Sequence, residues 1–127
     1  MIHINQSAPE FKTAIFHQDK QSSLSLSSLH GKWVVLFFYP GDFTFVCPTE
    51  LEELADMYSK FKELNVEVLS ISTDSVEVHK AWKDASDTIK KIKFPMIAEP
   101  TGNICKMYGT YIEDEGVALR GTIIINP

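Results

Sequence analysis

Cysteine is scarce in this sequence: the 127 residues include only Cys47 and Cys105, and they form no Cys-x-x-Cys pair. Two distant cysteines cannot build a disulfide framework, so we expect a reducing, cytoplasmic setting. Long apolar runs are also absent. Since no segment is long enough to span a bilayer and the N-terminus lacks a signal-peptide core, we expect no membrane partner.

Positive charge is limited as well. Lys and Arg together number 12 against 17 Asp and Glu, which gives a net charge of −5, and no basic run is present. This balance gives no reason to expect a nucleic-acid partner. With 44% hydrophobic and 23% charged residues, the composition is that of an ordinary soluble protein. The length predicts a single domain over residues 1–127, with a real core.

Hydrophobic periodicity predicts an α/β order of elements. Alternating segments around residues 11–16 and 24–29 predict an N-terminal β-hairpin. The further elements, in chain order, are expected as strands at 33–39, 66–72, 94–98 and 118–126, and as helices at 47–63, after residue 74 and at 104–108. A strand, a helix and a strand at this spacing predict a right-handed unit with parallel strands.

The second of these helices has a capping residue at its start and an apolar stripe. Asp74 or Ser75 is expected to cap it. The stripe is predicted to consist of Val78, Ala81, Trp82, Ala85, Ile89 and Ile92. This choice of face places His79 on the side that leans toward solvent, and we assign it no chemistry.

The segment around Cys47 is the most informative part of the chain. An apolar strand ends at Pro40-Gly41-Asp42, and an amphipathic helix begins at Cys47, with Pro48 in its first turn. N–H groups and the dipole at a helix start favour a thiolate over a thiol. Thr44 lies one turn earlier, where its hydroxyl could reach the sulfur. A buried cysteine chosen for packing explains the position equally well.

Two charged residues are candidates for the same site. Arg120 is the only arginine and lies in an otherwise apolar segment, where a buried guanidinium needs an anionic partner. An edge-strand arginine that faces water is the alternative. Glu50 follows Cys47 by three residues, although the helix dipole alone favours a carboxylate there. His30 and His79 have no second ligand at a metal-binding spacing, so we expect no metal.

The residues Pro40, Thr44 and Cys47, within Phe-Tyr-Pro-Gly-Asp-Phe-Thr-Phe-Val-Cys-Pro-Thr-Glu, resemble the active-site signature of peroxiredoxins. More narrowly, the chain is similar to typical two-cysteine peroxiredoxins, including the peroxidatic subunits of bacterial alkyl hydroperoxide reductases. The resemblance covers nearly the whole chain, and its further matches are Ser72-Thr73-Asp74, His79-Lys80-Ala81-Trp82, Pro100-Thr101-Gly102, Asp114-Glu115-Gly116 and Leu119-Arg120-Gly121-Thr122.

The resemblance implies a fold and an activity. The fold would be thioredoxin-like, with a central mixed β-sheet flanked by helices, and one more strand and helix would follow Pro127. The activity would be a thiol-dependent peroxidase that reduces hydrogen peroxide and organic hydroperoxides through a sulfenic acid on Cys47. No cofactor is required. The implied partners are a dithiol reductant, either thioredoxin-like or a flavoprotein disulfide reductase, and further copies of the chain in a homodimer or ring of dimers.

The resemblance also implies roles for the other site residues. Thr44 and Arg120 would donate hydrogen bonds to the peroxide oxygens, and Arg120 would also lower the pKa of the Cys47 thiol. Pro40 would shield the sulfur from water, and Glu50 would hold the arginine.

Cys105 does not match the context of the family's resolving cysteine, so we favour a structural thiol over a resolving role. Two other functions remain alternatives. A thiol–disulfide oxidoreductase is disfavoured because Cys47-Pro48-Thr49-Glu50 lacks the second cysteine. A non-enzymatic role, such as a holdase, stays open.

Overall fold

The N-terminal hairpin is present in the computed structural model, which describes residues 3–43 and 47–127 and, for Cys47, the backbone alone. It consists of the antiparallel strands β1 (Lys12–His17) and β2 (Lys20–Ser25). Gln18 and Asp19 connect them, both with positive φ, as a two-residue type I′ turn requires. The second strand was predicted too late in the chain, because Leu26–Leu29 forms a 3-10 helix, η1, rather than a strand.

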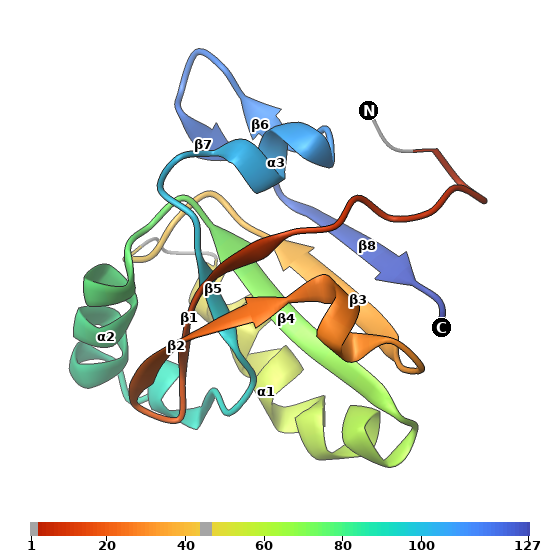
Figure 1. The fold of residues 1–127 in the computed structure, drawn as a ribbon. Helices are drawn as coiled ribbons and strands as arrows, with labels where there is room; N and C mark the ends of the chain where they lie inside the picture. Colours follow the sequence, from red (N-terminus) through yellow and green to blue (C-terminus); the bar gives the residue numbers. More distant parts are fainter. Residues whose placement is uncertain (1–2, 44–46) are drawn as a thin grey trace.

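One mixed sheet organises the chain, in the order β2-β1-β5-β4-β3-β8 (Figure 1). Its central strands are β3 (Trp33–Phe38), β4 (Val66–Ser72) and β5 (Met96–Ala98), which run parallel to one another. β1 pairs antiparallel with β5, and β8 (Gly121–Ile125) pairs antiparallel with β3. A separate ribbon consists of β6 (Tyr111–Ile112) and β7 (Val117–Ala118).

Helices cover both faces of the sheet. On one face lie α1 (Cys47–Glu63), α2 (Val76–Ala85) and the 3-10 helix η2 (Ile89–Lys91), which pack with Phe94 and Met96. On the other face, α3 (Asn103–Met107) packs against β3 and β4. Figure 1 shows α3 beside β6 and β7, away from α1. α1 links the parallel strands β3 and β4, so the predicted strand–helix–strand unit is confirmed.

The alternation of side chains in β3 explains why its sequence is apolar throughout. Val34, Leu36 and Phe38 belong to the core on the α3 face, whereas Val35 and Phe37 pack toward α1 and α2. A strand that is covered on both faces has no polar side, which is the usual pattern for parallel strands in a layered α/β fold. The sheet therefore holds the carboxyl ends of β3 and β4 rigidly side by side.

The buried face of α2 agrees with the predicted stripe only in part: Trp82, Ile89 and Ile92 are buried as predicted, but the last two lie beyond α2, which ends at Ala85. Val76, His79 and Trp82 are its buried residues, while Ala81 and Ala85 are exposed. The prediction followed the alanines, which are compatible with either environment, and it excluded a histidine that is polar but fully buried. The prediction that His79 leans toward solvent is therefore wrong. The cap prediction is confirmed for its second candidate, since the Val78 N–H donates to Ser75 Oγ at 3.2 Å.

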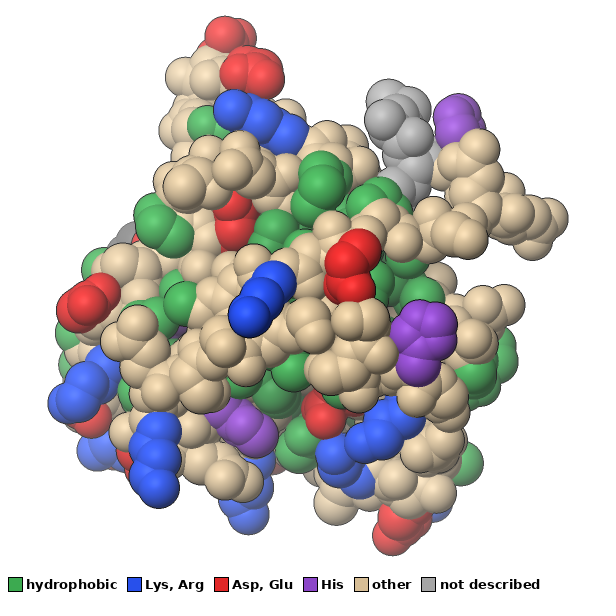
Figure 2. All heavy atoms as spheres, viewed as in Figure 1, with side chains coloured by type: hydrophobic (Ala, Val, Ile, Leu, Met, Phe, Trp, Pro, Cys, Tyr) green, Lys and Arg blue, Asp and Glu red, His purple; other side chains and the backbone are tan. Residues whose placement is uncertain are grey.

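Charges of both signs are interspersed on the face shown in Figure 2. Opposite charges also lie close together near η2: Lys90 Nζ lies 3.5 Å from Asp87 Oδ1, and Lys91 Nζ lies 3.7 Å from Glu52 Oε1. Across the described ranges, no helix combines the length and apolar character needed to cross a membrane.

Candidate functional site

The candidate site lies where the parallel strands β3 and β4 end. Tyr39 and Pro40 directly follow β3, and Asp74 lies two residues after the end of β4. The Tyr39 N–H donates to the Ile71 carbonyl at 3.1 Å, so the two chain segments stay adjacent past the end of β3. The edge formed by carboxyl ends of parallel strands is the usual location of sites in α/β sheets.

α1 begins at Cys47, as predicted, and continues to Glu63. Its first turn contains Glu50, and Leu51 anchors the helix as a fully buried side chain. Thr44 lies outside the described residues, so its predicted hydrogen bond to the Cys47 sulfur stays a prediction. Pro40 is half-buried; its role as a shield is likewise a prediction.

Arg120 and Glu50 are brought together by the fold. Arg120 Nη1 donates to Glu50 Oε2 at 3.0 Å, and the side chains are 39% and 31% exposed. The contact joins the segment before β8 to the first turn of α1. A guanidinium is therefore held at the end of the helix that Cys47 begins, where it is accessible from solvent.

The surroundings of Arg120 differ from those predicted. The sequence placed it inside a strand from Ala118 to Asn126, but β7 ends at Ala118 and β8 begins at Gly121. Arg120 lies at the bend between them and is exposed. The argument that a buried guanidinium demands a partner was therefore wrong for this residue, although a carboxylate partner is present.

A buried polar network next to this site was not predicted. His79 Nδ1 lies 2.6 Å from Asp42 Oδ2, and both side chains are fully buried. Tyr39 donates its hydroxyl to Asp42 Oδ1 at 2.6 Å. The Asp42 N–H donates to Asp74 Oδ2 at 2.7 Å, and the Ser72 hydroxyl donates to the same oxygen at 2.8 Å. The network thus ties the segment after β3 to the segment after β4 and to α2.

The protonation of His79 follows from its two partners. Its second ring nitrogen, Nε2, lies 2.9 Å from the Ile97 carbonyl oxygen, which can only accept, so Nε2 carries a hydrogen. A second proton lies between Nδ1 and Asp42. Burial disfavours the charged imidazole, but the hydrogen bond and the charge of Asp42 outweigh it, so the pKa of His79 is raised. Burial also raises the pKa of Asp42, which likewise keeps the shared proton on the pair.

The same residues have ligand atoms close enough for a metal ion. Atoms of Asp42, Asp74 and His79 lie within 4.8 Å of one another. However, both nitrogens of His79 are already engaged with Asp42 and the Ile97 carbonyl. A ligating nitrogen must be free of its proton and point at the ion, so this geometry fits a hydrogen-bonded network rather than a metal centre.

Cys105 is buried on the other face of the sheet from α1. Its side chain belongs to the core that contains Phe38 and Tyr108, and it is fully inaccessible to solvent. Burial raises the pKa of the Cys105 thiol to about 11, with a further contribution from the charge of Glu99. A neutral, inaccessible thiol is a poor nucleophile, which supports the structural interpretation.

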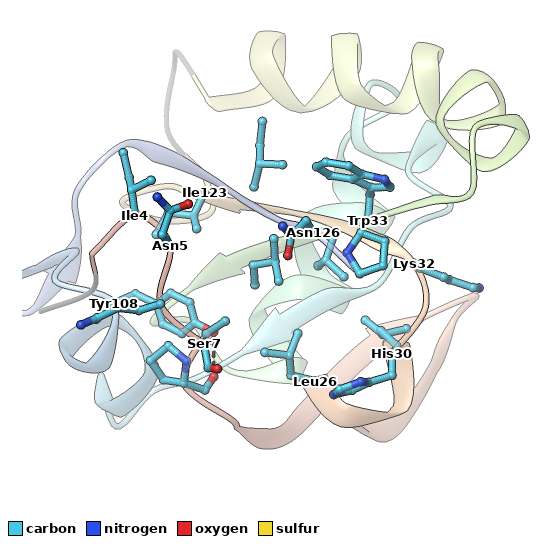
Figure 3. Close-up of a pocket in the computed structure, with 18 of the residues that line it drawn as sticks. Ile4, Asn5, Ser7, Leu26, His30, Lys32, Trp33, Tyr108, Ile123 and Asn126 are labelled. Carbon is cyan, nitrogen blue, oxygen red and sulfur yellow. Dashed lines mark hydrogen bonds between the residues drawn. The ribbon is translucent and has the colours of Figure 1, made fainter.

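A hollow lies elsewhere on the described part of the chain (Figure 3). It has a volume of about 890 Å³ and is bounded by the N-terminal segment with Ile4 and Asn5, by Leu26 and Trp33, and by Ile123 of β8. Its lining includes neither Glu50 nor Arg120 nor His79. It is therefore separate from the candidate site.

Comparisons with known proteins agree with one another. The model of the AhpC/TSA family matches residues 4–127. Alkyl hydroperoxide reductase C of Salmonella typhimurium is 44% identical over 124 residues, which cover 98% of this chain and 66% of that protein. The crystal structure of Enterococcus faecalis AhpC matches with a TM-score of 0.96 at 45% identity, covering 100% of this chain and 76% of that one. The reduced 2-Cys peroxiredoxin of Plasmodium vivax matches with a TM-score of 0.92 at 36% identity, covering 98% and 79%.

These matches bear on the fold and on the extent of the chain. The TM-scores confirm the predicted fold class, a thioredoxin-like arrangement with a mixed sheet flanked by helices. The chain spans about 66% of the length of the curated relatives.

Proposed function

Because the chain belongs to the AhpC/TSA family, which confirms its resemblance to peroxiredoxins, we propose that it acts as a thiol-dependent peroxidase with Cys47 as the nucleophile. The observation that carries this proposal is the position of Cys47 as the first residue of the long helix α1. The Arg120–Glu50 pair at the first turn of the same helix supports it. The proposed substrates are hydrogen peroxide and organic hydroperoxides.

The proposed reaction is a two-electron oxidation of sulfur. The Cys47 thiolate attacks one oxygen of the hydroperoxide, an S–O bond forms, and the O–O bond breaks. The bonding electron pair leaves with the second oxygen, which takes up a proton and departs as water or an alcohol. Cys47 is left as a sulfenic acid. The chain supplies the electrons, so this step requires no cofactor.

Charge stabilisation in this step would come from groups that surround the helix start. Free N–H groups in the first turn of α1 favour both the thiolate and the developing negative charge on the leaving oxygen. Arg120 would supply planar N–H donors to the peroxide oxygens, and Glu50 would fix its orientation through the 3.0 Å contact. Thr44 would add a hydroxyl donor, and Pro40 would limit access of water to the sulfur.

The return to the thiol requires a partner. A second thiol must condense with the sulfenic acid, releasing water, and an external dithiol must then reduce the disulfide. We propose a thioredoxin-like protein or a flavoprotein disulfide reductase in the cytoplasm as the source of that dithiol, and a homodimer or a ring of dimers as the assembly. Membership of the AhpC/TSA family supports these partners. Cys105 is too deeply buried to be the second thiol without local unfolding.

Stopped-flow mixing with a stoichiometric amount of hydrogen peroxide tests the proposal. We expect the Cys47 thiol to be consumed in a single turnover much faster than the free-cysteine reaction, with one peroxide lost per thiol. Mass spectrometry should locate one added oxygen on Cys47. Reaction at the rate of a free thiol would contradict the peroxidase and would favour a non-enzymatic role.

A further inference from the structure

The Asp42–His79 pair occupies a place in the fold that bears on Cys47. Asp42 lies five residues before the helix start, and Leu51 lies four residues after it. Both residues are buried: Asp42 is 8% exposed and Leu51 0%. Within the described ranges, these residues are the buried attachments that flank the segment containing Cys47. Leu51 is held by packing, whereas Asp42 is held by hydrogen bonds.

Both the side chain and the backbone of Asp42 are held by hydrogen bonds. Its carboxylate contacts Tyr39 at 2.6 Å and His79 at 2.6 Å, and its backbone N–H contacts Asp74 at 2.7 Å. Three different parts of the chain therefore fix this residue: the end of β3, the segment after β4, and α2. His79 is fixed in turn by the Ile97 carbonyl of β5. These hydrogen bonds of Asp42 and His79, together called the anchor, therefore extend to a central strand of the sheet.

Phe43, the residue after Asp42, has an unusual backbone conformation. Phe43 has a φ of +59°, a left-handed conformation that is unfavourable for a residue with a side chain. The residue is 58% exposed, and its ring centroid lies 6.1 Å from that of Trp82, three residues after His79 in α2. The hydrogen bonds on Asp42 fix the backbone immediately before this residue.

We propose that the Asp42–His79 pair is a positioning element for the start of α1, which keeps the backbone at Cys47 oriented for the proposed reaction. The inference rests on the proposed role of Cys47 as nucleophile. His79 and Asp42 act through the backbone and do not touch the peroxide. The titratable groups that act on His79 are Asp42 and Asp74, from the segments after β3 and β4, and Tyr39 contacts Asp42.

The pair links the position of the helix start to the state of one shared proton. When that proton is lost, no hydrogen remains between Nδ1 and the Asp42 carboxylate, so this hydrogen bond is lost and Asp42 faces Asp74 without a compensating imidazolium. The first turn of α1 then loses its fixed orientation. A thiolate depends on aligned N–H groups, so a loosened first turn stabilises it less.

The test measures the pKa of the Cys47 thiol from the pH dependence of its alkylation by iodoacetamide, in the whole protein with Cys105→Ala to leave one thiol. The variants are His79→Gln, Asp42→Asn and the two combined, with His30→Gln as a matched control at an exposed histidine. Circular dichroism and thermal melting check that each variant is folded. We expect His79→Gln to raise the pKa of Cys47 by about one unit, which is a tenfold loss of thiolate at a given pH below the pKa. The control should equal the parent.

Further comparisons separate positioning from general stability. The double variant should shift the Cys47 pKa no more than His79→Gln alone, because both substitutions release the same anchor. Asp42→Asn, which keeps an acceptor for Tyr39, should have the smaller effect. If His79→Gln fails to fold, Tyr39→Phe removes a single hydrogen bond from the same anchor and should raise the pKa in the same direction.

Folded variants with an unchanged Cys47 pKa would overturn the inference, even if their melting temperature falls. The alkylation measurement does not require peroxidase activity. A parent protein that is slow toward peroxide would therefore contradict the proposed function, while the pKa comparison would still decide the positioning role.

Discussion

Arg120 and Glu50 are 70 positions apart in the sequence, yet Arg120 Nη1 and Glu50 Oε2 lie 3.0 Å apart in the structure. Both side chains are partly exposed, so an ion pair of this kind contributes at most about 1 kcal/mol to folding. The main effect of the ion pair is to orient the guanidinium, because the carboxylate fixes its planar set of N–H donors beside the first turn of α1. Substitutions here should affect the reaction far more than stability.

Arg120→Lys should slow the oxidation of Cys47 by peroxide by about 10²-fold or more, the cost of removing one preorganised donor. A lysine keeps the charge but cannot reproduce the planar geometry. The free energy of unfolding should change by less than about 1 kcal/mol. Stopped-flow kinetics and urea denaturation measure the two effects, and Lys20→Arg, at an exposed lysine of β2 on the opposite edge of the sheet from β8, serves as a control. If Arg120→Lys has the parental rate and the parental Cys47 pKa, Arg120 is not part of the site.

Cys47→Ser should abolish peroxide reduction, because a serine hydroxyl at neutral pH provides almost no anion for the attack. The matched variant Cys105→Ser should leave the first oxidation step unchanged, since its thiol is buried and protonated. Peroxide consumption and the mass of the oxidised peptide give the answer. Loss of sulfenic acid in the Cys105 variant would reassign the nucleophile.

The two thiols should not form a disulfide with each other during turnover of the native chain. Cys105 lies in the core on the opposite face of the sheet from α1. Its thiol also has a pKa raised by burial to about 11, so little thiolate exists at neutral pH. Under excess peroxide without a dithiol, we expect sulfinic acid on Cys47, detected by mass spectrometry. Rapid appearance of a Cys47–Cys105 disulfide would instead identify Cys105 as the resolving thiol.

The pH dependence of stability should carry the signature of His79. Its folded pKa is raised above the ordinary value of 6.5 by Asp42, against the opposing effect of burial. The folded state therefore retains a proton that the unfolded state releases above about pH 6.5, and the stabilisation disappears as the pH rises through the folded pKa. In this window, the slope is at most about 1.4 kcal/mol per pH unit for one proton.

His79→Gln should remove that slope. Urea denaturation of the two proteins at a series of pH values measures the difference, which cancels contributions from other groups. A difference in unfolding free energy that is constant from pH 6 to 9 would mean that His79 does not hold the extra proton.

Gly102→Ala should destabilise the fold by about 2 kcal/mol or more. Gly102 has a φ of +77°, and an added Cβ would lie 2.6 Å from Cε1 of Tyr111. The conformational cost is about 1 kcal/mol for a residue with a side chain, and the contact with Tyr111 adds strain. Gly31→Ala is a useful comparison: φ is +90° there, but no atom lies within 4 Å of the added Cβ. Equal losses for both variants would show that the Tyr111 contact is relieved at no cost.

The sequence was sufficient for the elements that depend on local patterns. β3 and β4 read as apolar runs and α1 as a four-three repeat from Cys47 to Phe61, and the structure has them at the predicted positions. The hairpin was found from its alternation, but its second strand was displaced, since Leu24 to Leu29 alternates equally well as the end of a strand and as a 3-10 turn. Local patterns cannot separate those two states.

The Asp42–His79 network illustrates what the sequence could not provide. Asp42 follows a Pro-Gly turn and read as a turn residue, and His79 read as solvent-exposed because a histidine is rarely assigned to an apolar face. The spacing of Val76, His79 and Trp82 by three was the available signal, but only the juxtaposition with Asp42, 37 residues away, makes the buried position tolerable. Likewise, the bend at Arg120 lies between β7, which pairs with β6, and β8, which pairs with β3, and both pairings join residues distant in the sequence or across a loop.

The burial of Cys105 has a practical consequence for experiments on this chain. A sulfhydryl reagent cannot reach this residue until α3 separates from the sheet, since its side chain has no accessible surface in the folded state. The rate at which Cys105 is labelled near neutral pH therefore reports how often this part of the core opens. In a Cys47→Ser variant, Cys105 is the one thiol left, so its rate of reaction with a chromogenic disulfide reports local unfolding. The measurement needs only micromolar protein and no added fluorophore.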